Sequence, residues 1–385
     1  MKVNISLLGR FHAFDLAFQL QKKNILHVLN TTYPANIVRR WGIDKKFIRT
    51  NNFIFEIIIR FNIKYKWFEN KKIDAIFKKR QAKSNFKYLD QCDIFIGWSG
   101  CSLEAIIEAK KKGKTTILER GSSHYNFQMA MNCSEFKEIG KVYEPDYATW
   151  QRELLEYELV DYISIPSSFV KRTFIEQGIS ESKLLLNPYG VNLEAFKQVE
   201  KKDTVFRVLY VGKLSFRKGS HYLLRAFSEL NLPNTELCHI GTISQEMESI
   251  VKKYSNNNIL YLGSKPQNEL YKSYSQGSVF VLLSLEEGLA MVQPQAMACG
   301  LPLICTTNTG GEDLISKNGE EGFVIPIRDV EALKEKLLYL YNNPVVCKEM
   351  GEKAKRRVEN SFSWDDYGDR YHKNLERIMN TNKNI

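Results

Sequence analysis

Short apolar runs alternate with longer amphipathic stretches along the first half of the chain. An apolar run of four to eight residues predicts a buried strand, and apolar positions recurring every three to four residues predict a helix. The predicted strands are residues 3–8, 25–30, 93–97, 115–119, 162–166 and 183–187. The predicted helices are residues 13–23, 102–112 and 168–177. Strands that alternate with helices indicate an α/β fold with a parallel sheet covered on both faces.

The same alternation begins again after a polar stretch at residues 197–204, which we take as a domain junction. Here the predicted strands are 207–211, 236–240, 258–262, 278–284 and 303–306, and the predicted helices are 222–230, 246–254, 267–274 and 363–379. A chain of 385 residues suits two domains. We therefore expect Rossmann-like domains at 1–195 and 205–362, with a C-terminal helix at about 363–380 packing back on the first. Such sheets bind ligands at the carboxyl ends of their strands, so the site is expected in the cleft between the domains.

Composition restricts the class of protein. Hydrophobic residues make up 43% of the chain and charged residues 26%, as in globular proteins. The first apolar run, residues 3–8, is too short for a membrane span or a secretory signal, so we expect a cytoplasmic protein. Seven cysteines without a C-x-x-C pair predict reduced thiols rather than disulfides or a zinc site.

The positive charge is concentrated in one segment. Between Arg60 and Tyr88 ten basic residues face two acidic ones, within a chain of net charge +11. Apolar residues recur beside them at roughly helical spacing: Phe53, Ile54, Ile57, Ile58, Phe61, Tyr65 and Phe68. A basic amphipathic segment at 53–83 suits an anionic membrane surface, on the inner face of the cytoplasmic membrane. The alternative is a helix with one buried and one solvated face.

Several cofactor and metal sites are excluded by their missing motifs. The nearest match to a P-loop, at residues 113–115, has Glu108 where the first glycine belongs. No G-x-G-x-x-G follows a predicted strand, which counts against NAD. No Asp-x-Asp pair is present to hold a metal–diphosphate complex, and the six histidines lack metal-ligand spacing. We therefore expect no cofactor and no metal, so that protein cations and backbone amides neutralise any bound diphosphate.

Two segments of the second half carry the candidate chemistry. Gly212 and Gly219 enclose a loop with three cations, which favours phosphate binding; the alternative is an ordinary solvated turn. Glu286 and Glu287 precede Gly288 and a helix predicted to open around Pro294 and stop at Gly300. The free amides at a helix start favour anions, and a carboxylate accepts well from paired sugar hydroxyls. The alternative for the two glutamates is helix capping.

These segments resemble glycosyltransferase family 4, whose fold is GT-B. The resemblance is carried by residues 210–214 and 218–219, by Glu287-Gly288, by 295–304, by Gly310-Gly311 and by 322–326. In the first domain, residues 161–171 and 187–191 are similar to the approach to the family's domain crossover. The likeness covers about residues 90–375, and the first 90 residues match only loosely.

The resemblance implies a role for each matched residue. Lys213 and Lys218, beside Gly212, neutralise the diphosphate of the donor, and the family more often has arginine at the first position. Glu287 orients the transferred sugar, and Gln295 replaces a glutamate that binds the ribose. The amides that line sugar and phosphate are those of Gly288, Leu289, Ala290 and Met291. From the first domain, His124 faces the donor sugar, and we take Arg10 and His12 of the loop after the first strand as candidate acceptor contacts.

The expected function is that of a retaining, metal-independent glycosyltransferase. It would take a UDP- or GDP-sugar as donor and a glycan or lipid-linked acceptor, in polysaccharide or glycolipid biosynthesis. The alternatives are a GT-B nucleotide-sugar epimerase and a non-catalytic GT-B partner subunit, the latter because Gln295 departs from the pattern. A nucleic-acid partner would explain the charge but not the loops of the second domain, so none is expected.

Overall fold

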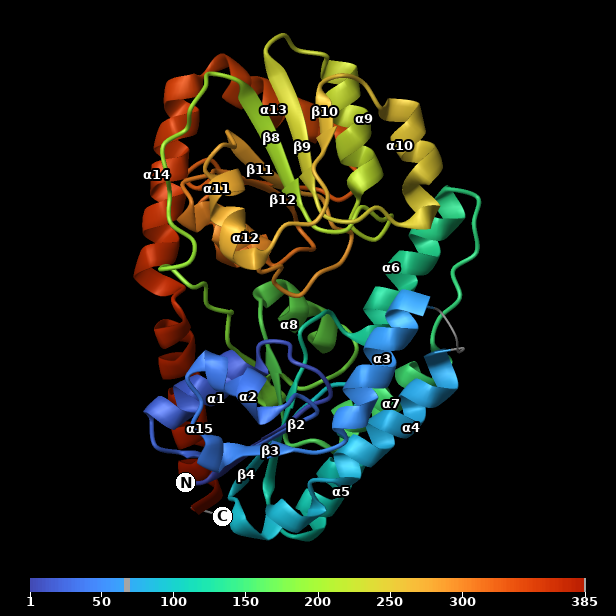
Figure 1. The fold of residues 1–385 in the computed structure, drawn as a ribbon, viewed down its shortest axis with the longest axis vertical. Coiled ribbons are helices and arrows are strands. Elements are labelled where there is room, and N and C mark those ends of the chain that lie inside the picture. Colours follow the sequence, from blue (N-terminus) through green and yellow to red (C-terminus); the bar gives the residue numbers. More distant parts are fainter. Residues whose placement is uncertain (66–69, 384–385) are drawn as a thin grey trace.

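The computed structural model describes residues 1–65 and 70–383 and consists of two lobes, each built on one parallel sheet (Figure 1). The seven-stranded sheet of the first lobe has the order β3-β2-β1-β4-β5-β6-β7. Its strands are β1 (Val3–Ser6), β2 (Leu26–Thr31), β3 (Ile48–Thr50), β4 (Ile94–Trp98), β5 (Thr115–Glu119), β6 (Tyr162–Ile165) and β7 (Leu184–Leu186). Its helices are α1 (Ala13–Lys22), α2 (Ala35–Val38), α3 (Phe53–Tyr65), α4 (Asn70–Lys83), α5 (Leu103–Lys111), α6 (Tyr125–Glu138), α7 (Tyr147–Leu159) and α8 (Ser168–Ile175).

The second lobe repeats the plan with a six-stranded sheet of order β10-β9-β8-β11-β12-β13. Its strands are β8 (Phe206–Val211), β9 (Thr235–Ile240), β10 (Ile259–Tyr261), β11 (Val279–Leu282), β12 (Leu303–Thr306) and β13 (Gly322–Ile325). Its helices are α9 (Ser220–Leu230), α10 (Glu248–Tyr254), α11 (Leu270–Tyr274), α12 (Val292–Ala298), α13 (Val330–Asn342) and α14 (Pro344–Ser361). Both sheets pair in parallel and place their first strand centrally, which confirms the predicted doubly wound α/β class.

The last helix, α15 (Trp364–Lys383), leaves the second lobe and lies along the first (Figure 1). It packs against α1, where Asp365 accepts hydrogen bonds from Gln19 at 2.9 Å and from Lys22 at 2.5 Å. The chain crosses between the lobes at two places, after β7 and after α14. These crossings touch, because the Val191 amide donates to the Phe362 carbonyl at 2.7 Å. The predicted return of the C-terminal helix is therefore confirmed.

The hydrophobic pattern located the central strands but missed the edge strands β3 and β13 and several helices, among them α6, α7, α13 and α14. Strand β3 contains a single buried residue, Ile48, so it carries no apolar run. Helix α6 buries the polar Asn132 and Glu135, and α7 buries Glu153 and Glu156. Because polar side chains occupy buried positions of α6 and α7, apolar residues do not recur there every three to four positions, and the pattern does not predict a helix.

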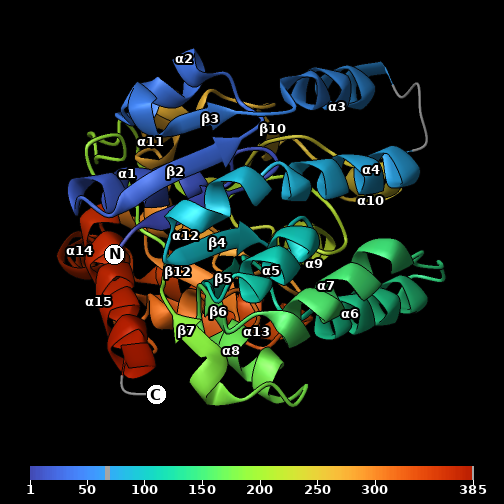
Figure 2. The ribbon, with the colours of Figure 1, turned by 90° about the horizontal axis from the view of Figure 1, so that it is seen from below.

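Helices α3 and α4 lie on the side of the first lobe opposite α15 (Figures 1 and 2). They pack through Phe55 and Phe77, whose rings stack with centroids 3.9 Å apart. Part of the segment predicted to be basic and amphipathic, including Lys66 and Phe68, lies outside the described residues. Within the described parts of the chain, no helix combines the length and apolarity needed to cross a bilayer.

Candidate active site

Residues 212–219, which we call the cation loop, follow β8. Hydrogen bonds to the backbone of this loop hold it in place. The Tyr210 hydroxyl donates to the Lys213 carbonyl at 2.9 Å, and the Leu214 amide donates to the Thr242 carbonyl at 2.9 Å. Farther along, the Arg217 carbonyl accepts from the Leu285 amide at 2.9 Å. The loop is thereby joined to the ends of both neighbouring strands, β9 and β11. The Lys213 side chain is exposed, and no acceptor lies within hydrogen-bond distance of its ammonium among the residues described.

Arg217 and Lys218 of this loop converge on the two glutamates that follow β11. Lys218 forms a short ion pair with the Glu287 carboxylate. Arg217 bridges both carboxylates, with Nη1 3.0 Å from Glu286 Oε2 and Nη2 2.9 Å from Glu287 Oε1. The alternative of an ordinary solvated turn is therefore wrong for this part of the loop, because its cations are partly buried and paired.

Glu286 is fully buried and contacts the first lobe. Its Oε1 accepts hydrogen bonds from the Ser122 hydroxyl, from the Ser123 hydroxyl at 2.8 Å and from the Ser123 amide at 2.9 Å. Burial acts to raise the pKa of Glu286, but the Arg217 charge and these hydrogen bonds outweigh burial and hold the pKa below its usual value. The carboxylate is therefore ionised. The sequence analysis gave no role to Arg217 or Glu286. The signal that could have found them is the third cation in the loop and the second glutamate beside Glu287.

The backbone after Glu287 leads into helix α12. No described residue accepts a hydrogen bond from the amides of Gly288, Leu289, Ala290 or Met291. Helix α12 begins after Met291 and has no side-chain cap, so the alternative of helix capping by the glutamates is wrong. The amides with which the resemblance lines sugar and phosphate thus have no partner within the described part of the chain.

Two glycines explain how closely the loops meet. Gly219 has φ of +60°, and a Cβ there would collide with the carbonyl of Leu283, so this glycine serves a backbone-to-backbone approach between the loop and β11. Gly288 lies against the carbonyl of Gly121, which follows β5 of the first lobe. The carboxyl ends of β5 and β11 therefore face each other, and the two lobes touch at this point.

Gln295 lies on α12 with its side chain buried. Its Oε1 accepts a hydrogen bond of 3.3 Å from the hydroxyl of Tyr274, which is itself buried at the end of α11. The assigned ribose contact stays a prediction, and a ribose would have to compete with this tyrosine for the amide.

His124 lies at the start of α6 inside the first lobe. Its Nδ1 accepts from the Asn126 amide at 3.2 Å, so the ring caps the helix, and it packs between the rings of Tyr157 and Phe174. Burial, with the nearby charge of Arg120, lowers the pKa of His124 to about 4, so the ring is neutral. The contact with a donor sugar stays a prediction. The structure gives this side chain a capping role.

The two candidate acceptor residues, Arg10 and His12, contact different groups of the first lobe. The Arg10 guanidinium lies over the ring of Trp41, 5.1 Å from its centroid. His12 lies among aromatic rings and forms a hydrogen bond of 2.9 Å between its Nε2 and the Glu119 carboxylate. Glu119 also accepts from the Tyr371 hydroxyl of α15 at 2.6 Å. The loop after β1 is thereby tied to the C-terminal helix, and acceptor binding by Arg10 or His12 stays a prediction.

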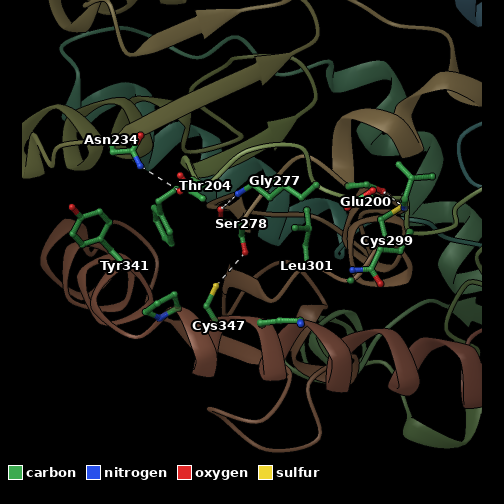
Figure 3. A pocket seen from close by; sticks show the side chains of 17 residues that line it. Glu200, Thr204, Asn234, Gly277, Ser278, Cys299, Leu301, Tyr341 and Cys347 are labelled. Carbon is green, nitrogen blue, oxygen red and sulfur yellow. Dashed lines mark hydrogen bonds between the residues drawn. The ribbon is translucent and has the colours of Figure 1, made fainter.

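A cavity of about 850 Å³ lies elsewhere in the second lobe, between the segment that enters β8 and the start of α14 (Figure 3). None of the assigned site residues lines it. Two of its side chains form bonds within the protein: Lys201 Nζ donates to the Val205 carbonyl and the Ser278 hydroxyl at 2.6 Å each, and Cys347 donates to the Ser278 carbonyl at 3.3 Å. These bonds hold the connecting segment to the lobe, so this cavity is no candidate for the site.

The region that holds the cation loop and the glutamates matches a known family. Residues 191–357 match the family model described as "Glycosyl transferases group 1". This part of the second lobe is therefore similar to the group 1 glycosyltransferases. The matched range contains Lys213, Arg217, Lys218, Glu286 and Glu287, whereas Ser122, Ser123 and His124 lie in the first lobe, outside it.

The chain is also similar to a known glycosyltransferase. The capsular polysaccharide biosynthesis glycosyltransferase CapM of Staphylococcus aureus is 28% identical over 247 residues, which are 57% of this chain and 61% of CapM. The match thus spans less than two thirds of that relative's length.

Solved structures align with nearly the whole chain. Sucrose-phosphate synthase of Thermosynechococcus elongatus aligns with a TM-score of 0.70 at 18% identity, over 98% of this chain and 99% of that chain. Anabaena Alr3699/HepE in complex with UDP aligns with a TM-score of 0.69 at 12% identity, over 98% of this chain and all of its own. The two-lobed arrangement, with one parallel sheet in each lobe, is the GT-B fold.

Proposed function

We propose that this protein is a retaining, metal-independent glycosyltransferase. It transfers a sugar from a UDP- or GDP-sugar to a glycan or lipid-linked acceptor in polysaccharide or glycolipid assembly. The observation that carries the proposal is the convergence of Arg217 and Lys218 on Glu287, next to backbone amides that have no acceptor among the residues described. Cations and amides neutralise a diphosphate, and a carboxylate beside them accepts from sugar hydroxyls.

Each part of the site then has a step in the transfer. Lys213 and Lys218 hold the diphosphate, the Gly288–Met291 amides bind phosphate and sugar oxygens, and Glu287 orients the sugar. The bond between the anomeric carbon and the phosphate oxygen breaks, and its electron pair stays on the leaving phosphate. The acceptor oxygen bonds to the same face of that carbon, and its proton passes to the leaving phosphate. The chain accelerates this step by positioning and by stabilising the developing negative charge.

The test is turnover of a panel of UDP- and GDP-sugars by the purified protein with EDTA present, using lipid-linked and free oligosaccharide acceptors. We expect one donor to be consumed and its sugar transferred with retained configuration. Strict dependence on added manganese, or an inverted product, contradicts the mechanism. Release of an isomerised nucleotide-sugar identifies the epimerase alternative, and nucleotide binding without any conversion identifies the partner-subunit alternative.

We also propose that α3 and α4 dock on an anionic membrane surface, which would bring a lipid-linked acceptor to the site. On α3 the side chains of Phe53, Ile54, Ile57 and Phe61 are exposed, with Ile54 63% accessible. On α4, Ile76 is exposed on the same helical face as Lys79 and Lys83. Apolar side chains beside lysines suit the headgroup boundary of an anionic bilayer.

Replacing Ile54 and Ile57 with aspartate should lower binding to vesicles that contain phosphatidylglycerol by at least about tenfold. The two exposed aliphatic side chains that would enter the bilayer are lost, and two negative charges are added. Co-sedimentation measures the effect. Val345→Asp, an equally apolar and exposed position on α14, is the matched control and should bind like the wild type. Equal binding by all three proteins would refute the docking surface while leaving the proposed transfer intact.

A further inference from the structure

Glu286 connects the donor site of the second lobe to a loop of the first lobe. One carboxylate oxygen accepts three hydrogen bonds from Ser122 and Ser123, and the other contacts Arg217. The carboxylate is fully buried, and Arg120 of the first lobe is also close enough to interact with its charge. A buried carboxylate that holds partners from two lobes loses much of its stabilisation when the lobes separate.

Arg217 links Glu286 to Glu287, because it contacts both carboxylates. Its guanidinium lies between the two carboxylates and donates from Nη1 to the Glu286 side chain and carbonyl, each at 3.0 Å. Its other terminal nitrogen pairs with Glu287 at 2.9 Å. The guanidinium is planar and rigid, so once Glu286 fixes Nη1, the orientation of Nη2 toward Glu287 is fixed as well. The position of Glu287 therefore depends on Glu286, and through it on the serines of the first lobe.

We propose that Glu286 is a positioning residue that couples contact between the lobes to the geometry of the donor site. When Ser122 and Ser123 reach Glu286, its carboxylate fixes Arg217, and Arg217 in turn fixes Glu287 beside the backbone amides. When the lobes part, Arg217 loses its anchor and can neutralise Glu287 alone. The inference rests on the proposed function, because it assigns a role within that same site.

The proposal is tested by a double-mutant cycle on kcat. Glu286→Gln keeps the shape of the side chain but removes its charge, and the pair Ser122→Ala with Ser123→Ala removes the contacts from the first lobe. We expect each change to lower kcat by about tenfold or more, and the combined protein to be no slower than the slower of the two, because all three residues act through one contact. The Kd for UDP or GDP should change by less than about threefold, since the cations of the loop remain.

Arg172→Ala is the matched control. It removes another ion pair between the lobes, Arg172 with Glu312 at 2.6 Å, that does not touch Arg217 or Glu287. This variant should keep the kcat of the wild type. A purely structural role for Glu286 would lower the melting temperature of Glu286→Gln while the folded protein kept its kcat, and would overturn the proposal. The proposal would also be overturned if the losses of kcat from Glu286→Gln and from the serine substitutions multiplied in the combined protein. A loss of kcat in Arg172→Ala as large as that in Glu286→Gln would overturn it too.

A measurement without substrate separates this inference from the proposed function. If the wild type converts no nucleotide-sugar, the function is what fails, and the coupling is then judged by small-angle scattering. Glu286→Gln should give a larger radius of gyration than both the wild type and Arg172→Ala, because the three hydrogen bonds to the first lobe are weakened. An unchanged radius would overturn the coupling by itself.

Discussion

Replacing Lys218 with alanine is expected to lower kcat/KM by about 10²–10³-fold, the loss that follows removal of one preorganised charge-stabilising group. Lys218 lies at the end of the cation loop and pairs with Glu287. In the proposed transfer its ammonium faces the diphosphate, whose negative charge grows as the sugar departs. Removing the ammonium takes away stabilisation that is strongest in the transition state, so kcat should fall as well as donor affinity. Steady-state kinetics with the preferred donor measures both.

Two comparison variants make the Lys218 result specific. Lys252→Ala removes an exposed lysine from α10 of the same lobe and should retain the kinetics of the wild type, which excludes an effect of net charge. Lys218→Arg keeps the charge on a longer side chain and should recover part of the rate. Wild-type turnover by Lys218→Ala would show that the diphosphate is bound elsewhere.

The fold could be predicted from the sequence because its central strands are buried on both faces. Helices cover both sides of β4, β5, β11 and β12, so every residue of these strands is buried and the segments stand out as continuous apolar runs. Strand β13 is an edge strand that begins at a glycine and was not predicted as a strand. Helix α7 was hidden by Glu156, which accepts hydrogen bonds from the Ser102 and Leu103 amides at the start of α5.

The candidate site was predictable only in part, because its contacts depend on segments far apart in the sequence. Lys218 and Glu287 were assigned from motifs in which residue type and glycine spacing carry the signal. Glu286 contacts Ser122 and Ser123 across more than 160 positions, and no local pattern shows that its carboxylate is buried. His124 was assigned from its place after β5, whereas its capping bond to Asn126 appears only once α6 is formed.

Glu287→Ala should have the opposite effects on binding and on transfer. The carboxylate pairs with Lys218 and Arg217, so in the free protein it neutralises Lys218, one of the two cations that would hold the diphosphate. Removing it frees Lys218, whereas Arg217 stays paired with Glu286, and we expect UDP or GDP to bind at least as tightly as to the wild type. Transfer should still fall by about 10²–10³-fold, because the sugar loses the carboxylate that orients it and positioning accounts for a large part of the rate.

Titration calorimetry with the nucleotide and turnover of the nucleotide-sugar measure the two effects separately. Glu248→Ala, which removes an exposed carboxylate from α10, is the control for added positive charge and should leave both values unchanged. If Glu287 served only to hold the cation loop in place, its loss would weaken nucleotide binding together with transfer. Parallel losses of the two would therefore contradict a contact with the sugar. Unchanged transfer would contradict the placement of the donor beside Glu287, since nothing else in the proposed site supplies a carboxylate free to face the sugar hydroxyls.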